Sequence, residues 1–307
     1  MKYLVTGGVG FIGNNIVRLL LEYGHDVDIV DNLQVGKIEN IKDIIGKVNF
    51  SQIDIRDREK LEKVVKSYDG IFHEAALTSV PESFQKPEEY NDVNVIGTKN
   101  IFEIANREKI RVVYASSSSI YGNAAQVPIK ERYERKPINP YGQTKLDDEI
   151  LAEKFEELSV IGLRYFNVYG IGQNISYAGV ITKFLEQIKN KKPLTINGNG
   201  NQVRDFIHVK DIAKANLAAM ESNVKKGFFN VGTGISTSIN DLAKMMVELS
   251  DNENEIIHGL ELEGDIESSQ ADMEFTKKSI NWNYSIDLKE GLTELIQNTV
   301  NFHKSDS

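Results

Sequence analysis

The chain has 307 residues, a net charge of −9, 40% hydrophobic residues and no cysteine. That length supports a sizeable core, the acidic balance shows no basic footprint for nucleic acid, and the lack of cysteine excludes disulfides and thiolate-ligated zinc. The five histidines lack the i, i+4 spacing of a metal site, so we expect no metal. No apolar run reaches about 18 residues, so we expect no membrane span. The opening "MKYLVTGG" enters a buried-strand pattern without a signal-peptide core, which favours the cytoplasm.

Short β-rich apolar runs alternate with helical patterns through the first half of the chain. Alternation at this spacing predicts βαβ units, a parallel sheet and right-handed crossovers that place helices on both faces. The predicted strands cover 2–7, 26–31, 48–54, 70–76, 110–117 and 159–166. The predicted helices cover 11–22, 38–45, 57–67, 84–107 and 141–157.

The pattern of predicted elements changes after about residue 167. Helical segments predicted at 177–190, 209–222, 238–249 and 287–303 are separated by short strands and by turns rich in Gly or Asn. We expect a dinucleotide-binding domain over 1–166 and a smaller α/β substrate-binding subdomain over 167–307, with some elements interleaved. The segment 251–272 has eight Asp or Glu and no Lys or Arg, which is typical of a solvated surface loop.

The stretch "VTGGVGFIG" places three glycines between the first strand and the first helix. Gly7, Gly10 and Gly13 permit a tight turn and let backbone N–H groups approach a pyrophosphate at the helix N-terminus. A purely structural turn is the alternative. Phe11 and Ile12 lie within the same loop, so we expect them at the cofactor too.

The second strand ends in "DIVDN", where an acidic residue would bind the adenosine ribose. Asp31, followed by Asn32, would repel a 2′-phosphate, which favours NAD over NADP; the nearby Lys37 leaves that choice open. Asp54 and Ile55 end the third strand, where an adenine contact is usual in such folds. Asp54 could equally cap the helix that follows.

The sequence "PYGQTK" spaces a tyrosine and a lysine four residues apart. On a helix, Tyr141 and Lys145 project from one face, where an ammonium stabilises a neighbouring phenolate. Tyr141 could then remove a proton from a sugar hydroxyl. An ordinary surface pair on a helix is the alternative.

Several motifs in order resemble the extended short-chain dehydrogenase/reductase family, whose core is a Rossmann fold. They are "TGGVGFIG", "HEAA", "NVIGT", "ASSSSIYG", "YGQTK", "LRYFNVYG" and "RDFIHVKD", and they span about residues 1 to 303. Within the family, the pattern is most similar to the UDP-glucose 4-epimerase group and its relatives that accept UDP-N-acetylglucosamine. The resemblance implies bound NAD, a UDP-hexose substrate and a homodimer formed through the helices near 84–107 and 141–157.

The resemblance also assigns roles to individual residues. It implies a catalytic triad of Ser117, four positions before Tyr121, with Tyr141 and Lys145; Ser116 and Ser118 are alternatives to Ser117. The dehydratases of the family carry Asp-Glu where this chain has Ser118 and Ser119. Serines cannot replace that acid/base pair at neutral pH, which argues against dehydration and weakens a decarboxylase interpretation.

Further positions transfer from the family to its two ligands. Those implied for the cofactor are Ala75, Ala76, Phe166 and Asn94, for which a structural role is the alternative. Those implied for the substrate are Ser79, Ser117, Ser118, Asn167, Val180, Thr195, Asn197, Arg204 and Ser269. Arg204 suits a pyrophosphate, with an ion pair to Asp205 or Asp211 as its alternative. Ser269 stands where a bulky residue would exclude an N-acetyl group, so its small side chain implies that N-acetylated hexosamines fit.

Two departures from the family pattern concern the substrate. Leu262 replaces an arginine that would provide a second positive charge on the pyrophosphate, and a lysine is one candidate to bind the pyrophosphate in its place. In addition, "GIGQNIS" replaces the usual Pro-Arg after "YG". Other epimerase substrates such as UDP-glucuronate, a sugar-nucleotide reductase and a non-catalytic dinucleotide sensor remain alternatives.

Overall fold

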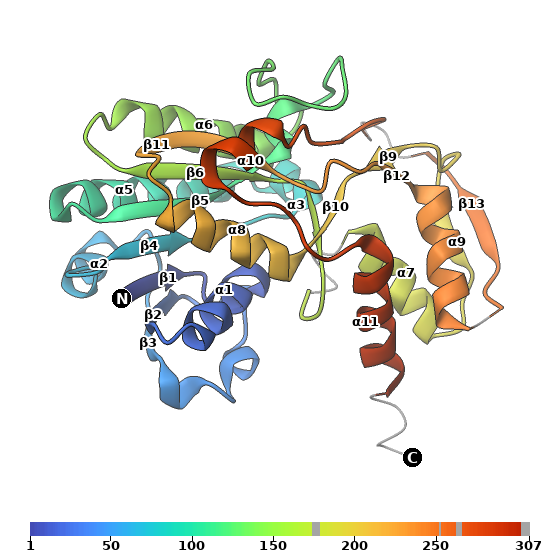
Figure 1. Cartoon of the computed structure of the whole chain (residues 1–307), viewed down its shortest axis with the longest axis horizontal. Coiled ribbons are helices and arrows are strands. Elements are labelled where there is room, and N and C mark those ends of the chain that lie inside the picture. Colours follow the sequence, from blue (N-terminus) through green and yellow to red (C-terminus); the bar gives the residue numbers. More distant parts are fainter. Residues whose placement is uncertain (174–178, 252, 262–265, 302–307) are drawn as a thin grey trace.

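A parallel sheet with helices on both faces forms the larger part of the molecule (Figure 1). The computed structural model describes residues 1–173, 179–251, 253–261 and 266–301. The order of strands in the sheet is β11-β6-β5-β4-β1-β2-β3, and all pairs are parallel. The strands are β1 (Lys2–Thr6), β2 (Asp26–Asp31), β3 (Asn49–Gln52), β4 (Gly70–His73), β5 (Arg111–Ser117), β6 (Val160–Tyr165) and β11 (Lys226–Val231). The predicted doubly wound sheet is therefore confirmed.

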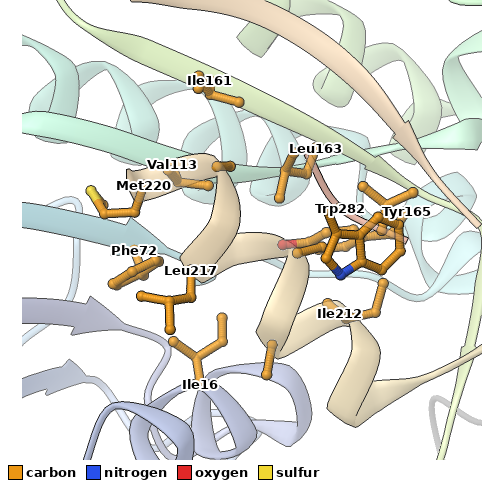
Figure 2. Packing of buried hydrophobic residues seen from close by; sticks show 14 of the residues in the cluster. Ile16, Phe72, Val113, Ile161, Leu163, Tyr165, Ile212, Leu217, Met220 and Trp282 are labelled. Carbon is orange, nitrogen blue, oxygen red and sulfur yellow. The ribbon is translucent and has the colours of Figure 1, made fainter. Parts of the chain in front are cut away.

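Each face of the sheet is covered by helices whose apolar sides are buried. Helices α1 (Phe11–Glu22) and α8 (Val209–Glu221) pack together on one face. Figure 2 shows Ile16 of α1 and Leu217 of α8 close to Phe72 of β4. The other face carries α2 (Arg58–Val64), α5 (Gly97–Glu108) and α6 (Pro140–Lys154) over a second apolar cluster.

A smaller lobe stands beside the carboxyl ends of the strands (Figure 1). Its core is a third apolar cluster formed largely by three helices, α7 (Val180–Lys189), α9 (Ile239–Ser250) and α11 (Leu288–Asn301). Three pairs of short strands connect the lobe internally: β7 (Asn167–Tyr169) with β10 (Phe206–His208), β9 (Val203–Arg204) with β12 (Thr237–Ser238), and β8 (Leu194–Asn197) with β13 (Ile256–Gly259).

The prediction of one long helix over 84–107 is wrong. The chain instead forms α3 (Val80–Gln85), α4 (Pro87–Tyr90), the π-helical segment η3 (Asn91–Ile96) and then α5. Lys86 leaves the helical conformation, and Pro87, which has no backbone N–H, starts the next helix at a position where proline is favoured. The break between α3 and α4 therefore follows from the sequence.

Other departures from the prediction are smaller. The helix predicted over 38–45 is wrong, because this region holds two 3-10 turns, η1 (Ile38–Ile41) and η2 (Ile45–Lys47). The acidic segment 251–272 contributes the largely exposed strand β13. A further 3-10 turn, η4 (Ser118–Tyr121), and the helix α10 (Glu274–Ile280) were not expected. No helix among the described residues has the length and apolar character needed to cross a membrane.

Candidate active site

A cavity of about 860 Å³ lies between the carboxyl ends of the sheet strands and the smaller lobe. Its walls come from the segments after β1, β2, β4, β5 and β6 and from α7, β8 and β9. The chain proceeds from β1 outward to β3 and returns to β4 on the other side of β1. The cavity therefore opens where strand order reverses, the usual position for a ligand in such sheets.

The glycine loop brings backbone close to the cavity at the start of α1. Gly7 has φ +68°, and a Cβ added there would lie 2.7 Å from the backbone nitrogen of Ala75. A Cβ on Gly13 would lie 2.2 Å from the carbonyl oxygen of Gly7. Only glycine fits these two positions. The first turn of α1 has neither a side-chain cap nor an acidic residue, so its N–H groups can accept an anion.

Asp31 ends β2 beside this loop. Its carboxylate accepts hydrogen bonds from the backbone nitrogens of Val9 at 3.2 Å and Leu33 at 2.8 Å, and burial raises its pKa. Both bonds fix the side chain, which lines the cavity along with Asn32 and Lys37. Glycine loop, helix N-terminus and fixed carboxylate together fit the pyrophosphate and ribose of a dinucleotide.

The serine run lies at the end of β5, and its members have different partners. Ser117 Oγ donates to Ser119 Oγ at 3.1 Å and accepts from the backbone nitrogen of Ser119 at 3.1 Å. Both side chains line the cavity. Ser116 also lines it, but its hydroxyl donates to Glu149 Oε1 at 2.7 Å. Ser117 is therefore the better placed of the two to meet a ligand.

Helix α6 presents Tyr141 and Lys145 to the same cavity. Its N-terminus is fixed by Asn139, whose side chain accepts a hydrogen bond from the nitrogen of Gly142 at 2.7 Å. The Lys145 ammonium donates to the carbonyl oxygen of Ala115 at 2.9 Å, which holds it at the carboxyl end of β5. The phenol, the ammonium and the Ser117 hydroxyl thus belong to residues that line the same cavity, as a proton-transfer site requires.

Lys145 also has an acidic neighbour deep in the protein. Asp148 Oδ2 lies 3.5 Å from Lys145 Nζ, and its side chain is fully buried. Burial raises the pKa of Asp148 to about 7, although Lys145 opposes this by favouring the carboxylate.

The smaller lobe supplies the other end of the cavity. Residues predicted for the substrate that line this end are Asn167, Val180, Thr195, Asn197 and Arg204. Lys183 of α7 lines it too. Leu262, which replaces an expected arginine, lies outside the described residues. Phe166, Ile55, Ala75 and Ala76, predicted for the cofactor, also line the cavity, as do Gly7, Gly10, Phe11, Ile12 and Gly13.

The loops behind Arg204 are held by one buried carboxylate. Asp205 accepts hydrogen bonds from Thr233, through both its nitrogen and its hydroxyl, and from the nitrogens of Gly234 and Ala271. Asp211, the other partner considered for Arg204, accepts from Ser285 and from the nitrogen of Ile286. Both carboxylates thus serve to hold loops of the smaller lobe.

Five predicted residues are not part of the cavity wall. Asp54 pairs with Arg56 at 2.7 Å and accepts from Asn32 at 2.9 Å, while Asp57 is the residue that caps α2. Ser79 caps α3.

The buried Asn94 bonds both backbone groups of Leu77 and the hydroxyl of Thr144. Ser118 is the first residue of η4. The backbone nitrogen of Ser269 donates to Val203 at 3.1 Å, and the residue is buried.

Several residues on the wall were not among the predicted site residues, and two of them carry polar groups beside predicted ones. Ser119 is the hydrogen-bond partner of Ser117. Glu74, the second residue of "HEAA", accepts a hydrogen bond from Tyr165 at 2.9 Å. An acidic residue beside the alanines predicted at the cofactor was the available signal.

Known proteins resemble this chain over nearly its whole length. The sequence profile of the NAD dependent epimerase/dehydratase family matches residues 3–232. A putative UDP-glucose 4-epimerase of Methanocaldococcus jannaschii is 39% identical over 95% of this chain and 96% of its own. The solved UDP-N-acetylglucosamine 4-epimerase of Methanobrevibacter ruminantium, in complex with UDP-N-acetylmuramic acid, has a TM-score of 0.93 and 36% identity over 98% of both chains. The UDP-glucose 4-epimerase of Thermus thermophilus, in complex with NAD, has a TM-score of 0.88 and 30% identity over 98% of this chain and 99% of that one.

Proposed function

Because the chain belongs to the NAD dependent epimerase/dehydratase family, we propose that it is an isomerase that inverts C4 of UDP-hexoses. Its cofactor is NAD, for which the glycine loop and Asp31 provide the site. The observation that carries the proposal is one cavity in which Ser117, Tyr141 and Lys145 meet that glycine loop.

In the proposed reaction, each of three residues of the cavity wall has its own role. The Tyr141 phenolate takes the proton of the sugar O4, with Ser117 as its hydrogen-bond relay and the Lys145 ammonium as its electrostatic support. NAD, held by the glycine loop and Asp31, would supply the reversible hydride acceptor for C4. The 4-keto sugar then rotates in the cavity and presents its opposite face. Tyr141 afterwards returns the proton to O4. No net oxidation occurs.

The serines that follow Ser117 argue against the nearest alternative chemistries. Elimination of water needs an acid/base pair, and Ser118 and Ser119 supply hydroxyls instead of carboxyl groups. In addition, Ser119 is engaged with Ser117. Epimerisation is the reaction that uses the remaining groups.

Two cations suit the diphosphate of a nucleotide sugar. Arg204 and Lys183 are the charged residues on the lobe side of the cavity wall, and Lys183 forms no ion pair with any described residue. An arginine fork and a lysine ammonium are both common phosphate ligands. We therefore assign the two phosphates to this pair and the uridine to the neighbouring Val180.

We extend the proposal to N-acetylated substrates through the family resemblance, in which a small residue such as Ser269 admits them; Ser269 itself lies outside the cavity wall, beside β9. The solved UDP-N-acetylglucosamine 4-epimerase that resembles this chain supports the same extension. A packed site would resist an added acetamido group by about 1–3 kcal/mol.

A product assay tests the proposed reaction. The protein is incubated separately with UDP-glucose, UDP-galactose, both N-acetyl analogues and UDP-glucuronate, and the C4 epimers are separated by chromatography. We expect interconversion of the hexoses without added cofactor. Epimers from UDP-glucuronate alone would reassign the substrate, consumption of free NADPH would indicate a reductase, and no turnover with bound NAD would leave a dinucleotide sensor.

We also propose that the enzyme is a homodimer that acts in the cytoplasm, where NAD and nucleotide sugars are produced. Large apolar side chains are exposed on the elements expected at the dimer interface: Phe84 on α3 is 61% exposed, Ile96 on η3 43% and Ile150 on α6 37%. Sedimentation should show a dimer in the unmodified protein and a monomer after Phe84→Glu with Ile150→Glu. A monomeric unmodified protein would reject the interface.

A further inference from the structure

Glu74 is an acidic residue on the cavity wall for which the proposed reaction has no use. It directly follows β4, and its backbone nitrogen donates to the carbonyl oxygen of Thr6 at 3.1 Å. The next residue, Ala75, is the one whose backbone a Cβ on Gly7 would strike. Glu74 therefore stands beside the glycine loop that holds the pyrophosphate, in the same cavity as Tyr141 and Lys145.

A chain of hydrogen bonds fixes the orientation of this carboxyl group. The hydroxyl of Tyr165 donates to Glu74 Oε1 at 2.9 Å, and Asn216 Nδ2 donates to the Tyr165 hydroxyl at 2.7 Å. Asn216 is itself held, because the same nitrogen donates to the carbonyl oxygen of Ile212 at 3.0 Å. Burial raises the pKa of Tyr165 well above its usual range, so this phenol remains a donor. One carboxyl oxygen is thus occupied, in a residue that lines the cavity.

The charges around Glu74 make its ionisation responsive to a ligand. Burial raises the pKa of Glu74 to about 8, while the Lys145 ammonium from α6 acts in the opposite direction. Tyr141 of the same helix lines the cavity together with Tyr165 of β6, and α8 presents the neutral Asn216. A further positive charge in the cavity would favour the carboxylate.

We propose that Glu74 is the counter-charge of the cationic nicotinamide ring of NAD⁺, held in place by Tyr165 and Asn216. The carboxylate attracts the ring only in its oxidised form, because reduction makes the ring neutral. The protein therefore binds NAD⁺ more tightly than NADH. This role depends on NAD binding and not on which nucleotide sugar is the substrate.

The reduction potential of the bound cofactor tests this role without any sugar. Redox titration of the holoenzyme, followed at the absorbance of the reduced nicotinamide, is compared between the unmodified protein and Glu74→Gln. Glutamine keeps an oxygen acceptor for Tyr165 and removes the charge. We expect the preference for NAD⁺ over NADH to fall roughly tenfold, which raises the potential by about 30 mV for a two-electron couple.

Three further variants control the experiment. Glu59→Gln on α2, outside the cavity, should leave the potential unchanged. In a protein that already carries Tyr141→Phe, Glu74→Gln should still raise the reduction potential by the same amount. The reason is that Glu74 and the Tyr141 phenol interact with the charge of the ring independently of each other. Should Glu74→Gln lose its cofactor, Tyr165→Phe frees the carboxyl group and should raise the potential in the same direction. An unchanged or lowered potential in these Glu74 or Tyr165 variants overturns the proposal, whatever the product assay shows.

Discussion

Neighbouring serines at the end of β5 differ in function because successive side chains of a strand point to opposite faces. Ser116 donates to Glu149, inside the protein, whereas Ser117 pairs with Ser119 on the cavity wall. The Ser117 hydroxyl both donates and accepts hydrogen bonds. Such a hydroxyl can receive one proton while it gives up another, so it can relay a proton without becoming charged. At this scale, the position of one oxygen separates the serine bound to Glu149 from the one that we propose as catalytic.

Replacement of Tyr141 by Phe removes the hydroxyl that we propose moves the O4 proton, and little else. We expect kcat to fall by about 10²- to 10⁴-fold, the usual contribution of general acid/base catalysis. NAD should remain bound, because the glycine loop and Asp31 are untouched. The measurements are turnover of UDP-galactose and the cofactor released on denaturation. Full activity would show that another group is the base.

Lys183→Met tests the assignment of the second phosphate cation. Loss of a hydrogen bond to a charged group weakens binding by about 1.5–3 kcal/mol, and solvent screening at the cavity mouth reduces this. We therefore expect KM for the nucleotide sugar to rise about tenfold with kcat nearly unchanged. Lys189→Met, in the last turn of the same helix and outside the cavity, is the control. Binding of UDP but not of UMP should weaken, and equal weakening of both would place Lys183 elsewhere.

At the scale of elements, one buried ion pair connects several secondary structures. Arg164 of β6 donates to Glu149 of α6 through Nε at 2.8 Å and Nη2 at 2.7 Å. Its Nη1 donates to the Tyr121 hydroxyl of η4 at 2.7 Å, and Tyr121 in turn donates to Asn230 of β11 at 2.7 Å. The helix that carries Tyr141 is therefore tied to three other elements.

Glu149→Gln breaks this pair and leaves a buried guanidinium without its charge partner. We expect the free energy of unfolding to fall by about 3–5 kcal/mol, measured by denaturation in urea. Glu153→Gln, which removes an exposed partner of Arg135 on the same helix, should change it by less than about 1 kcal/mol. Comparable losses in both variants would mean that the burial of Glu149 has no special weight.

The elements near the site also show which secondary structure can be predicted from sequence patterns and which cannot. Most strands and helices of the sheet domain follow from apolar periodicity, which is a local signal. The break at Lys86 and Pro87 was readable in the sequence, but the π-helical turn of η3 was not. That turn coincides with Asn94, whose side chain bonds Leu77 and Thr144, so tertiary contacts accompany the change of helix type.

At the scale of the whole molecule, buried acids should make stability depend on pH. The folded-state pKa of Asp148 is about 7, raised by burial above its value of 3.8 in an unfolded chain. Between these values the folded protein keeps a proton that the unfolded chain has lost. The stabilisation is therefore complete below about pH 4 and is lost as pH rises through 7.

Asp148→Asn should remove this dependence. We expect the free energy of unfolding of the unmodified protein, relative to this variant, to fall on the order of 2 kcal/mol or more between pH 4 and 7. Asp147→Asn, at the preceding and partly exposed position, serves as the control and should follow the unmodified protein. Parallel pH profiles for all three would show that Asp148 is ionised in the fold throughout.

The site was predictable where one short motif contains the chemistry, and it was not where distant residues meet. The glycine loop, Asp31 and the pair of Tyr141 and Lys145 could be proposed from short motifs and their order along the chain, and all of them line the cavity. For Glu74 the sequence offered only its place beside Ala75 and Ala76, because its partner Tyr165 is 91 residues away along the chain. Ser79 and Asp54 show the opposite case: the sequence predicted ligand contacts, and the structure places one as a helix cap and the other in an ion pair.

The edge strand β11 has a consequence for synthesis of the protein. It completes the sheet beside β6 only after the chain has formed β7 to β10, and α8, which covers one sheet face with α1, precedes it directly. A ribosome releases the N-terminal end first. Until residue 231 has emerged, the nascent chain carries an uncovered apolar face and an open strand edge, both prone to aggregation. Chaperone demand should therefore peak late in translation, and ribosome-bound chains arrested shortly before this point should be the most protease-sensitive.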